Sequence, residues 1–432
     1  MSPPVQAEII TLGCRLNIAE SETIRQLAGA RDMVVVNSCA VTNEAVRETR
    51  RAIRRARRDR PDAEIVVTGC ASQIDPAGFA AMPEVNRIVG NLDKLRADHW
   101  GAAHPVPAAF DGHSRAFVEV QNGCDHRCTF CAIPFGRGPS RSVPAGGVID
   151  RIAALVDAGH REVVLTGVDL TSYGPDLPGA PTLGLLVERI LAHAPALERL
   201  RLSSLDGIEI DDRLFDLITT ERRVMPHVHL SLQAGDDMIL KRMKRRHSRA
   251  DSVRLVERLK AAGPEIAIGA DLIAGFPTES EAMFADTRAL IDDCDIVHAH
   301  IFRYSPRADT PAARMPQIEP EVRKARAALL REAAAGRKAA WLHSLVGSTQ
   351  QVLVERPGDR GHSGNFAEVA VDTQPVGDVI AVKVERTDGI KLFGSSAKAG
   401  VQLQDAAEAA HRSVSTSFPT GPLPSPGIKK SA

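Results

Sequence analysis

Short apolar runs alternate with helical stretches along most of this 432-residue chain, and this alternation constrains its fold more than any other feature. Between about Ala116 and Trp341, six runs have strand character, and amphipathic or alanine-rich stretches lie between most of them. The runs are Phe117–Val120, Glu162–Gly167, Leu200–Ser204, Val228–Leu232, Ile266–Leu272 and Val297–Phe302. Six such units predict an α/β fold with an incomplete parallel barrel, whose site lies at the carboxyl ends of the strands.

The first hundred residues show the same alternation on a smaller scale, which predicts a small parallel sheet. Its strand-like runs are Glu8–Cys14, Met33–Cys39 and Glu64–Cys70, and each of them ends in a cysteine. Because open parallel sheets bind ligands at the carboxyl ends of their strands, we expect Cys14, Cys39 and Cys70 on one edge. Three thiolates there could hold an iron–sulfur cluster with one iron open. The alternative is three small buried hydrophobic residues.

A second set of cysteines follows the first strand of the predicted barrel. Cys124, Cys128 and Cys131 have the spacing CxxxCxxC, with the aromatic residue Phe130 before the last of them. Three thiolates at this spacing can bind three corners of a 4Fe–4S cluster and leave the fourth iron without a protein ligand. A structural zinc site needs a fourth ligand at ordinary spacing, and none follows nearby. The pattern therefore favours a cluster over a zinc knuckle.

Four further residues lie at equivalent strand ends of the predicted barrel. Gly167 and Asp169 follow the second strand, and Ser203 and Ser204 follow the third. Because this is the face that carries the CxxxCxxC loop, we predict that these four residues, with Phe130, bind the cofactor.

The chain after the barrel predicts a small β domain and a tail without a core. Three alternating runs, Gln351–Glu355, Ala367–Val371 and Val379–Val384, with glycine-rich turns between them, predict a small antiparallel barrel. Beyond Asp405 the composition is rich in Ala, Ser, Pro and Gly, which predicts disorder. The expected domains are 5–105, 112–342 and 343–403, followed by a disordered tail at 404–432.

Composition places the chain among ordinary globular proteins, with 44% hydrophobic and 25% charged residues. No apolar run is long enough to span a bilayer, and the N-terminus lacks the features of an export signal, so we expect no membrane contact. Seven cysteines in such a chain favour metal or catalytic use over disulfides, and the cytoplasm is the expected compartment. Cys294 has no neighbouring thiol, and we assign it to helix packing.

The formal net charge is zero, but two segments are strongly basic. The segments Arg47–Arg60 and Lys241–Arg249 concentrate positive charge, which is the kind of local excess that binds nucleic acid phosphates. The alternative for each segment is a solvated arginine-rich helix.

Together, the two cysteine sets resemble those of the radical S-adenosylmethionine methylthiotransferases, over about residues 7 to 400. The stretches similar to the signatures of that family around its first three cysteines are Thr11–Asn17 with Glu20–Glu22, Asn37–Thr42 and Thr68–Cys70. The resemblance implies two 4Fe–4S clusters. The auxiliary cluster would be bound by Cys14, Cys39 and Cys70, and the catalytic one, which also binds S-adenosylmethionine, by Cys124, Cys128 and Cys131. It also implies that the C-terminal barrel is a TRAM domain that contacts the substrate.

Further stretches are similar to the members that act on N6-threonylcarbamoyladenosine in tRNA: Leu165–Gly174, His229–Asp237, Tyr304–Pro316 and Gly361–Phe366. This similarity implies a transferase that adds a methylthio group to C2 of that nucleoside by radical chemistry. The expected partners are the anticodon stem-loop of tRNA and an electron donor of unknown identity. The alternatives are the same chemistry on isopentenyladenosine tRNA or on an aspartate of a ribosomal protein, and a zinc-dependent RNA-binding protein without catalysis.

Overall fold

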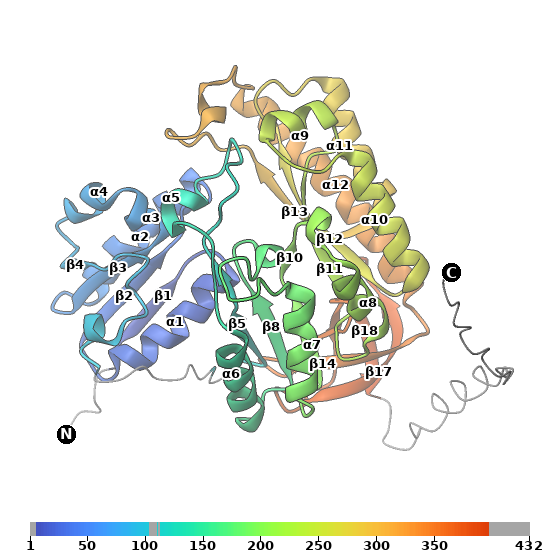
Figure 1. The fold of residues 1–432 in the computed structure, drawn as a ribbon, viewed down its shortest axis with the longest axis horizontal. Helices are drawn as coiled ribbons and strands as arrows, with labels where there is room; N and C mark the ends of the chain where they lie inside the picture. The colour runs from blue at the N-terminus through green and yellow to red at the C-terminus, as the bar shows by residue number, and fades with distance from the viewer. Residues whose placement is uncertain (1–5, 103–109, 111–112, 397–432) are drawn as a thin grey trace, which may run out of the picture.

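The computed structural model describes residues 6–102, 110 and 113–396 of the chain. Within these ranges the chain forms three parts, coloured from blue to red in Figure 1. A parallel sheet with its helices comes first, a longer series of parallel strands with outer helices follows, and a small closed β-barrel comes last. The predicted α/β architecture is thus confirmed.

The N-terminal sheet is parallel throughout, in the order β1-β2-β3-β4. Its strands are β1 (Glu8–Thr11), β2 (Met33–Ser38), β3 (Glu64–Gly69) and β4 (Arg87–Ile88). Its helices are α1 (Arg15–Ala28), α2 (Asn43–Asp59), α3 (Cys70–Ile74) and α4 (Pro76–Ala80). Every position of β2 is buried, because helices cover both faces of the sheet. Ile53 of α2 and Phe79 of α4 lie in the apolar cluster on one side, and Ile24 of α1 and Trp100 lie in the cluster on the other.

Most strands of the central part lie, within the described residues, in two parallel sheets, β5-β8-β9 and β10-β11-β12-β13. The strands are β5 (Arg115–Glu119), β8 (Glu162–Thr166), β9 (Arg199–Leu202), β10 (Ser204–Leu205), β11 (His227–Gln233), β12 (Ala267–Ala274) and β13 (Ile296–Arg303). A separate antiparallel pair is formed by β6 (Gln121–Asn122) and β7 (Arg141–Ser142). Only Ser203 separates β9 from β10, so the two sheets continue as one curved series. In the described part of the chain β5 and β13 are edge strands, and the predicted barrel is therefore incomplete, as expected.

Helices cover the outside of this curved series (Figure 1). They are α6 (Ala145–Asp157), α7 (Leu183–His193), α8 (Asp212–Thr220), α10 (Arg249–Ala262), α11 (Glu281–Asp293) and α12 (Pro320–Ser344). The apolar faces of these helices form the largest hydrophobic cluster of the molecule with the strands. Cys294, which ends α11, is fully buried in this cluster, as its assignment to helix packing requires.

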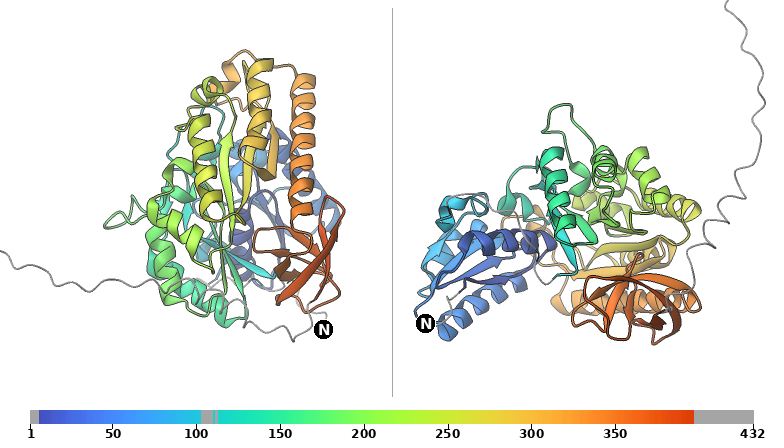
Figure 2. Two further views of the ribbon diagram at one scale, coloured as in Figure 1. Left: turned by 90° about the vertical axis from the view of Figure 1, so that its right-hand side faces the viewer. Right: turned by 90° about the horizontal axis from the view of Figure 1, so that it is seen from below.

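The C-terminal part is a closed barrel of β14 (Thr349–Glu355), β15 (Arg360–Ser363), β16 (Glu368–Ala370), β17 (Val379–Thr387) and β18 (Leu392–Ser396). In the left view of Figure 2, α12 runs from the central part down to this barrel. The predicted barrel is confirmed, with one difference: β16 and β18 pair in parallel, while the other pairs are antiparallel. The sequence did not predict β15 and β18, because glycine and polar residues interrupt their alternation.

The expected domain limits remain predictions, and 5, 105, 112, 403 and the whole tail 404–432 lie outside the described residues. Among residues 6–102, 110 and 113–396, no helix has both the length and the apolar character that crossing a membrane requires.

Candidate functional site

Three cysteines meet at the carboxyl edge of the N-terminal sheet, where their positions in the sequence predict them. Cys14 caps the amino end of α1, Cys39 directly follows β2, and Cys70 directly follows β3 as the first residue of α3. All three are free thiols. Burial, together with repulsion from Cys14 and Cys70, raises the pKa of Cys39 to about 11. Gly13 has a φ of +97°, and a Cβ there would lie 2.7 Å from Sγ of Cys39, so the chain can pass this thiol only as glycine.

The second trio occupies the loop between β6 (Gln121–Asn122) and α5 (Ile133–Arg137). The backbone N–H of Cys124 donates to the carbonyl of Gly138 at 3.1 Å, and that of Cys131 donates to the carbonyl of Cys128 at 3.1 Å. All three thiols are half-buried and free. Burial raises the pKa of Cys131 to about 11 and also raises that of Cys124. The loop thus holds three thiols together in partly desolvated surroundings.

Helix α5, which begins two residues after Cys131, packs against α3 and so joins the two trios. A Cβ on Gly136 would lie 3.1 Å from Cβ of Cys70, so the two helices approach closely at that thiol. Asn91 donates to the carbonyl of Gly136 at 2.6 Å and lies 3.7 Å from Sγ of Cys70. The charge of Cys70 also raises the pKa of Cys131. The two trios therefore face each other across the boundary between the first two parts.

A buried ion network fixes this boundary beside the thiols. Glu20 of α1 accepts from Lys94 at 2.6 Å and from Arg137 of α5 at 2.9 Å, and all three side chains are 1% exposed. Burial alone would raise the pKa of Glu20, but the charges of Lys94 and Arg137 lower it to about 2. Arg137 also lies 4.0 Å from Sγ of Cys14. The arginine therefore links both parts to the first trio.

Asp169 lies against the second trio, as its strand-end position predicts. Its Oδ2 atom is 3.6 Å from Sγ of Cys124, 2.7 Å from Nε2 of His126 and 2.9 Å from the hydroxyl of Ser172. Burial alone would raise the pKa of Asp169, but the hydrogen bond and charge of His126 lower it. Asp169 is therefore ionised at neutral pH and positioned next to a thiol.

The other four residues predicted to bind the cofactor occupy different surroundings. The ring of Phe130 packs edge-on against the ring of Phe276, with 6.3 Å between their centroids, and this contact anchors the cysteine loop. Gly167 directly follows β8. Ser203 is buried, and its hydroxyl has no hydrogen-bond partner among the described residues, so it is available to a ligand. Ser204 is the first residue of β10. Their cofactor contacts stay a prediction.

Sequence reasoning missed two arginines that contact the thiols. Arg137 is one, and Arg245 is the other: its guanidinium lies 3.8 Å from Sγ of Cys128 and donates to Asp206 at 3.0 Å. Arg245 belongs to the basic segment Lys241–Arg249, which composition alone suggested for phosphate binding. Within this segment Arg246 also pairs with Asp206, at 3.1 Å. Two arginines of this segment therefore pair with one buried carboxylate, while the side chains of Lys241, Lys244 and Arg246 remain exposed.

The inner face of the curved strand series is charged, which the apolar character of the runs did not indicate. The ring of Phe366, from the turn between β15 and β16, identifies this face. Its centroid lies 4.7 Å from Cζ of Arg201 on β9, 5.2 Å from the ring of His227 on β11 and 5.8 Å from the ring of His298 on β13. A ring can contact side chains of all three strands only from the inner side of the curved series. Phe366 of the C-terminal barrel therefore lies on that side.

At the amino ends of β5, β8 and β9, Glu162 of β8 is fully buried among three arginines. Its carboxylate lies 3.1 Å from Arg115, 2.8 Å from Arg199 and 2.9 Å from Arg201. Burial alone would raise the pKa of Glu162, but the three guanidinium charges lower it to about 2.

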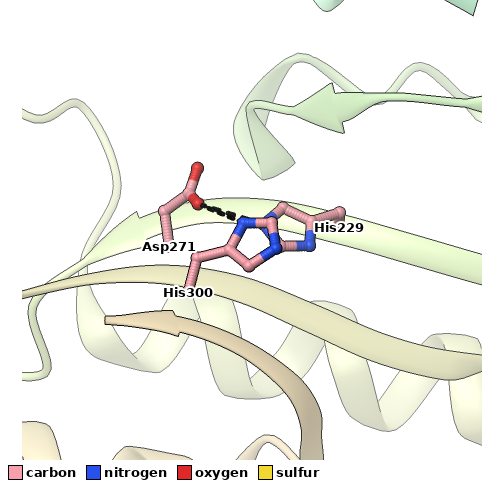
Figure 3. A group of neighbouring side chains, drawn as sticks. All are labelled: His229, Asp271 and His300. Carbon is pink, nitrogen blue, oxygen red and sulfur yellow. Dashed lines mark hydrogen bonds and ion pairs between the residues drawn. The ribbon is translucent and has the colours of Figure 1, made fainter. Parts of the chain in front are cut away.

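Further along the same face, His229, Asp271 and His300 come from the adjacent strands β11, β12 and β13 (Figure 3). Oδ1 of Asp271 accepts from Nε2 of His229 at 3.2 Å and from Nδ1 of His300 at 3.1 Å. Burial alone would raise the pKa of Asp271, but the two imidazoles lower it. Their ligand atoms lie within 4.8 Å of one another, a spacing that could hold a metal ion.

Two family models match this chain. The Radical SAM superfamily matches residues 118–291, and the family described as "Uncharacterized protein family UPF0004" matches residues 6–90. The first match covers the second cysteine trio, and the second match covers the first trio.

Relatives match over most of the chain. "Threonylcarbamoyladenosine tRNA methylthiotransferase MtaB" of Rickettsia prowazekii is 46% identical over 388 residues, which are 85% of this chain and 92% of that relative. The protein of the same name from Thermotoga maritima is 33% identical, with 86% and 91% covered. "tRNA-2-methylthio-N(6)-dimethylallyladenosine synthase" of Sorangium cellulosum is 35% identical, with 82% and 83% covered.

Among solved structures, the radical S-adenosylmethionine methyltransferase TsrM from Kitasatospora setae, with tryptophan substrate and a SAM analog bound, has a similar fold. The TM-score is 0.50 at 18% identity, over 68% of this chain and 66% of that chain.

Proposed function

This chain belongs to the MtaB group of radical S-adenosylmethionine methylthiotransferases, and from that membership we propose that it adds a methylthio group to C2 of N6-threonylcarbamoyladenosine in tRNA. The observation that carries this proposal is the meeting of two free-thiol trios across one boundary, with α5 packed between them. A sulfur-inserting enzyme needs a site that activates the substrate carbon and a site that supplies sulfur, close enough to serve one base.

The thiols fit iron–sulfur clusters on chemical grounds. Burial of Cys39, and then repulsion from Cys14 and Cys70, raises the pKa of Cys39 to about 11. Ionising the three thiols together therefore carries a cost in free energy. Bound iron would remove that cost, because a coordinated thiolate faces a cation rather than other anions. Membership of the family implies S-adenosylmethionine and two 4Fe–4S clusters as cofactors. We assign one cluster to Cys14, Cys39 and Cys70, and the other to Cys124, Cys128 and Cys131.

When bound, these cofactors supply one-electron chemistry that can replace hydrogen at an unactivated carbon with a methylthio group. The protein positions the reacting groups and shields them from water. Asp169 and His126 hold the loop of the second trio in an ionised hydrogen bond of 2.7 Å. Arg245 places a positive charge 3.8 Å from Cys128, and Arg137 places another 4.0 Å from Cys14. Both arginines would stabilise negative charge on the sulfurs.

The tRNA is proposed to present its anticodon stem-loop to the boundary between the trios. Single-stranded loops can splay out a base, which suits delivery of one purine between two buried centres. Helix α2, which begins four residues after Cys39, carries the other basic segment and would hold the phosphate backbone. A cytoplasmic location and an external electron donor follow from this role.

The test is the modified nucleoside itself. Protein reconstituted without oxygen is incubated with S-adenosylmethionine, a reductant and tRNA that carries N6-threonylcarbamoyladenosine, and the nucleosides are then analysed by mass spectrometry. Wild type should form the methylthio derivative and contain about eight irons per chain. The same assay is run in parallel with tRNA that carries N6-dimethylallyladenosine. A methylthio product from that tRNA, and none from the tRNA with N6-threonylcarbamoyladenosine, would contradict the proposed substrate.

Cysteine variants test the assignment of the clusters. Cys14→Ala should form no methylthio product but still produce 5′-deoxyadenosine, whereas Cys124→Ala should produce neither. Cys294→Ala is the matched control, because this thiol is fully buried in the main hydrophobic cluster and should leave product and iron content unchanged. If Cys14→Ala keeps its full iron content and still forms the product, the first trio has no role in the reaction.

A further inference from the structure

The guanidinium of Arg15 lies over an aromatic ring inside the curve of the central strands, but it forms no hydrogen bond or ion pair within the described residues. Arg15 is the first residue of α1 and follows Cys14 directly. Its side chain reaches away from the N-terminal sheet, because its Cζ atom lies 5.7 Å from the centroid of Phe366 inside the curve of the strands. Within residues 6–102, 110 and 113–396, no hydrogen bond or ion pair joins this guanidinium to another side chain. Arg15 thus brings a charge from the first cysteine trio into the central part.

The carboxylates that attract Arg15 are already engaged by other groups. The acidic residues that act on its charge are Glu162 and Asp271. Glu162 is bonded by the three arginines described above. Both imidazoles of the triad in Figure 3 donate to the same oxygen of Asp271. The next carboxylate, Glu355, ends β14 of the C-terminal barrel and reaches this face, where it pairs with Arg115 and His362.

The charge balance of the inner face therefore favours an anion. Four guanidinium groups, those of Arg15, Arg115, Arg199 and Arg201, face three carboxylates, those of Glu162, Asp271 and Glu355. A largely buried cation without a partner is unfavourable, and a free guanidinium fork matches an oxyanion with two parallel hydrogen bonds. A metal ion bound by His229, Asp271 and His300 would be repelled by Arg15, so we do not assign one there.

We propose that Arg15 binds the free carboxylate of the threonylcarbamoyl group of the substrate nucleoside. This inference rests on the proposed function, which places C2 of the same adenine beside the trio that includes Cys14. In that nucleoside a carbonyl joins N6 to the amino group of threonine, so the threonine carboxylate remains free. The N1–C6 edge of the ring and the carbamoyl linkage separate it from C2. A dimethylallyl group is uncharged and would leave the half-buried Arg15 without an anionic partner. Arg15 would therefore select one modified adenosine against the other.

The first arm of the test changes the ligand and keeps the wild-type holoenzyme. Its affinity is measured for three anticodon hairpins: one with N6-threonylcarbamoyladenosine, one with the methyl ester of that group, and one with unmodified adenosine. A charged hydrogen-bonded contact predicts that the carboxylate hairpin binds about tenfold to a hundredfold more tightly than the other two.

Two results of this arm are distinguishable failures. Equal binding of the carboxylate and unmodified hairpins would overturn both the inference and the proposed substrate. Preference for the threonylcarbamoyl group with equal binding of its methyl ester would overturn the inference alone.

The second arm changes the protein. Arg15→Gln should bind all three hairpins with the affinity that wild type shows for the methyl ester, and Arg15→Lys should retain part of the preference. Arg25→Gln is the matched control on the same helix, because Arg25 pairs with Glu22 at the other end of α1 and should keep the full preference. Iron content is measured for each variant, since Arg15 adjoins Cys14.

The same arm distinguishes two sources of the anion. Equal weakening of all three hairpins in Arg15→Gln would show that the guanidinium binds a backbone phosphate, and would overturn its assignment to the threonyl carboxylate. If Arg15→Gln loses iron, its affinities are set aside. The affinities of Arg15→Lys, and of wild type for the methyl ester, then test the contact between Arg15 and the carboxylate.

Discussion

At the scale of single residues, the molecule depends on carboxylates that stay ionised although they are buried. Glu20 and Glu162 are each 2% exposed or less, and the pKa of each is lowered to about 2 because adjacent cations outweigh the effect of burial. Removing one member of such a group is expensive, because the remaining charges have no water to solvate them. Each buried set of charges therefore determines which helices and strands pack against one another.

Replacing Glu162 tests this dependence. In Glu162→Gln the buried Arg199 and Arg201 and the half-buried Arg115 lose their shared carboxylate. We expect the free energy of unfolding of the central part to fall by about 3–5 kcal/mol. The measurement is chemical denaturation followed by circular dichroism. Glu188→Gln is the matched control, because Glu188 forms an exposed pair with Arg213, and its loss should cost no more than about 1 kcal/mol.

The same variant has a defined pH dependence. The folded-state pKa of Glu162, about 2, lies below the value of roughly 4.3 expected in the unfolded chain. A lowered pKa contributes stability that is present above the unfolded value and is lost as the pH falls through the folded one. Between pH 5 and pH 3, wild type should therefore lose more stability than Glu162→Gln. Parallel losses would show that Glu162 does not stay ionised in the fold.

At the scale of elements, α2 links the first trio to the central part. Asn43, its first residue, donates to the carbonyl of Pro306 at 3.0 Å and accepts from Arg307 at 2.8 Å, in the loop after β13. Two of its arginines pair with carboxylates of the N-terminal part: Arg50 bonds Asp75 at 2.8 Å, and Arg54 lies 3.9 Å from Glu84. The side chains of Arg54 and Arg55 are exposed. The surface left for phosphates is thus narrower than the basic segment Arg47–Arg60 suggests.

Reversing the charge of Arg54 and Arg55 together tests α2 as a tRNA contact. We expect weaker tRNA binding at low salt, and a slope of log affinity against log salt that is smaller by about one for each lost phosphate contact. Iron content should not change. Charge reversal of Arg213 and Arg254, exposed on α8 and α10 on the other side of the molecule in Figure 1, is the matched control. If Arg54→Glu/Arg55→Glu binds tRNA with the affinity of wild type, α2 is a solvated helix that does not contact the tRNA.

At the scale of the whole molecule, three parts converge on one region. The right-hand view of Figure 2 shows the blue N-terminal part beside the central part, with the red barrel packed on the central part. Arg137 of α5 extends into the N-terminal part, where it bonds Glu20, and Arg15 of α1 extends into the central part. Phe366 of the C-terminal barrel also extends into the central part, where it contacts Arg201. Each part therefore completes the interior of another.

Arg137 should couple the unfolding of the first two parts. Arg137→Met retains side-chain volume but leaves Glu20 with Lys94 as its only cation, and we expect the N-terminal part to unfold separately and at a lower temperature than in wild type. Differential scanning calorimetry should then show a split transition. Arg96→Met, which removes an exposed pair with Asp98, should leave the wild-type profile. A wild-type profile in Arg137→Met would mean that apolar packing alone joins the parts.

Much of this architecture could be predicted from the sequence, because the signals are local. Strand period, helix period and turn residues indicate the parallel strands, and each cysteine of the first trio stands directly after such a strand. Strand direction then places Cys14, Cys39 and Cys70 on one edge, and the CxxxCxxC spacing brings the second trio together by itself. These features need only neighbouring residues and the geometry of a parallel sheet.

The tertiary structure alone decided which polar side chains turn inward and which partners they find. Glu162, His229 and Asp271 lie in runs that resemble ordinary buried strands, and the sequence cannot show that guanidinium and imidazole groups from distant strands surround them. In the sequence, Arg15 and Arg137 do not differ from the other arginines. In the fold, Arg137 pairs with Glu20, whereas Arg15 has no carboxylate partner within the described residues. Pairing of buried charges depends on distances between segments far apart in the sequence, and only folding sets those distances.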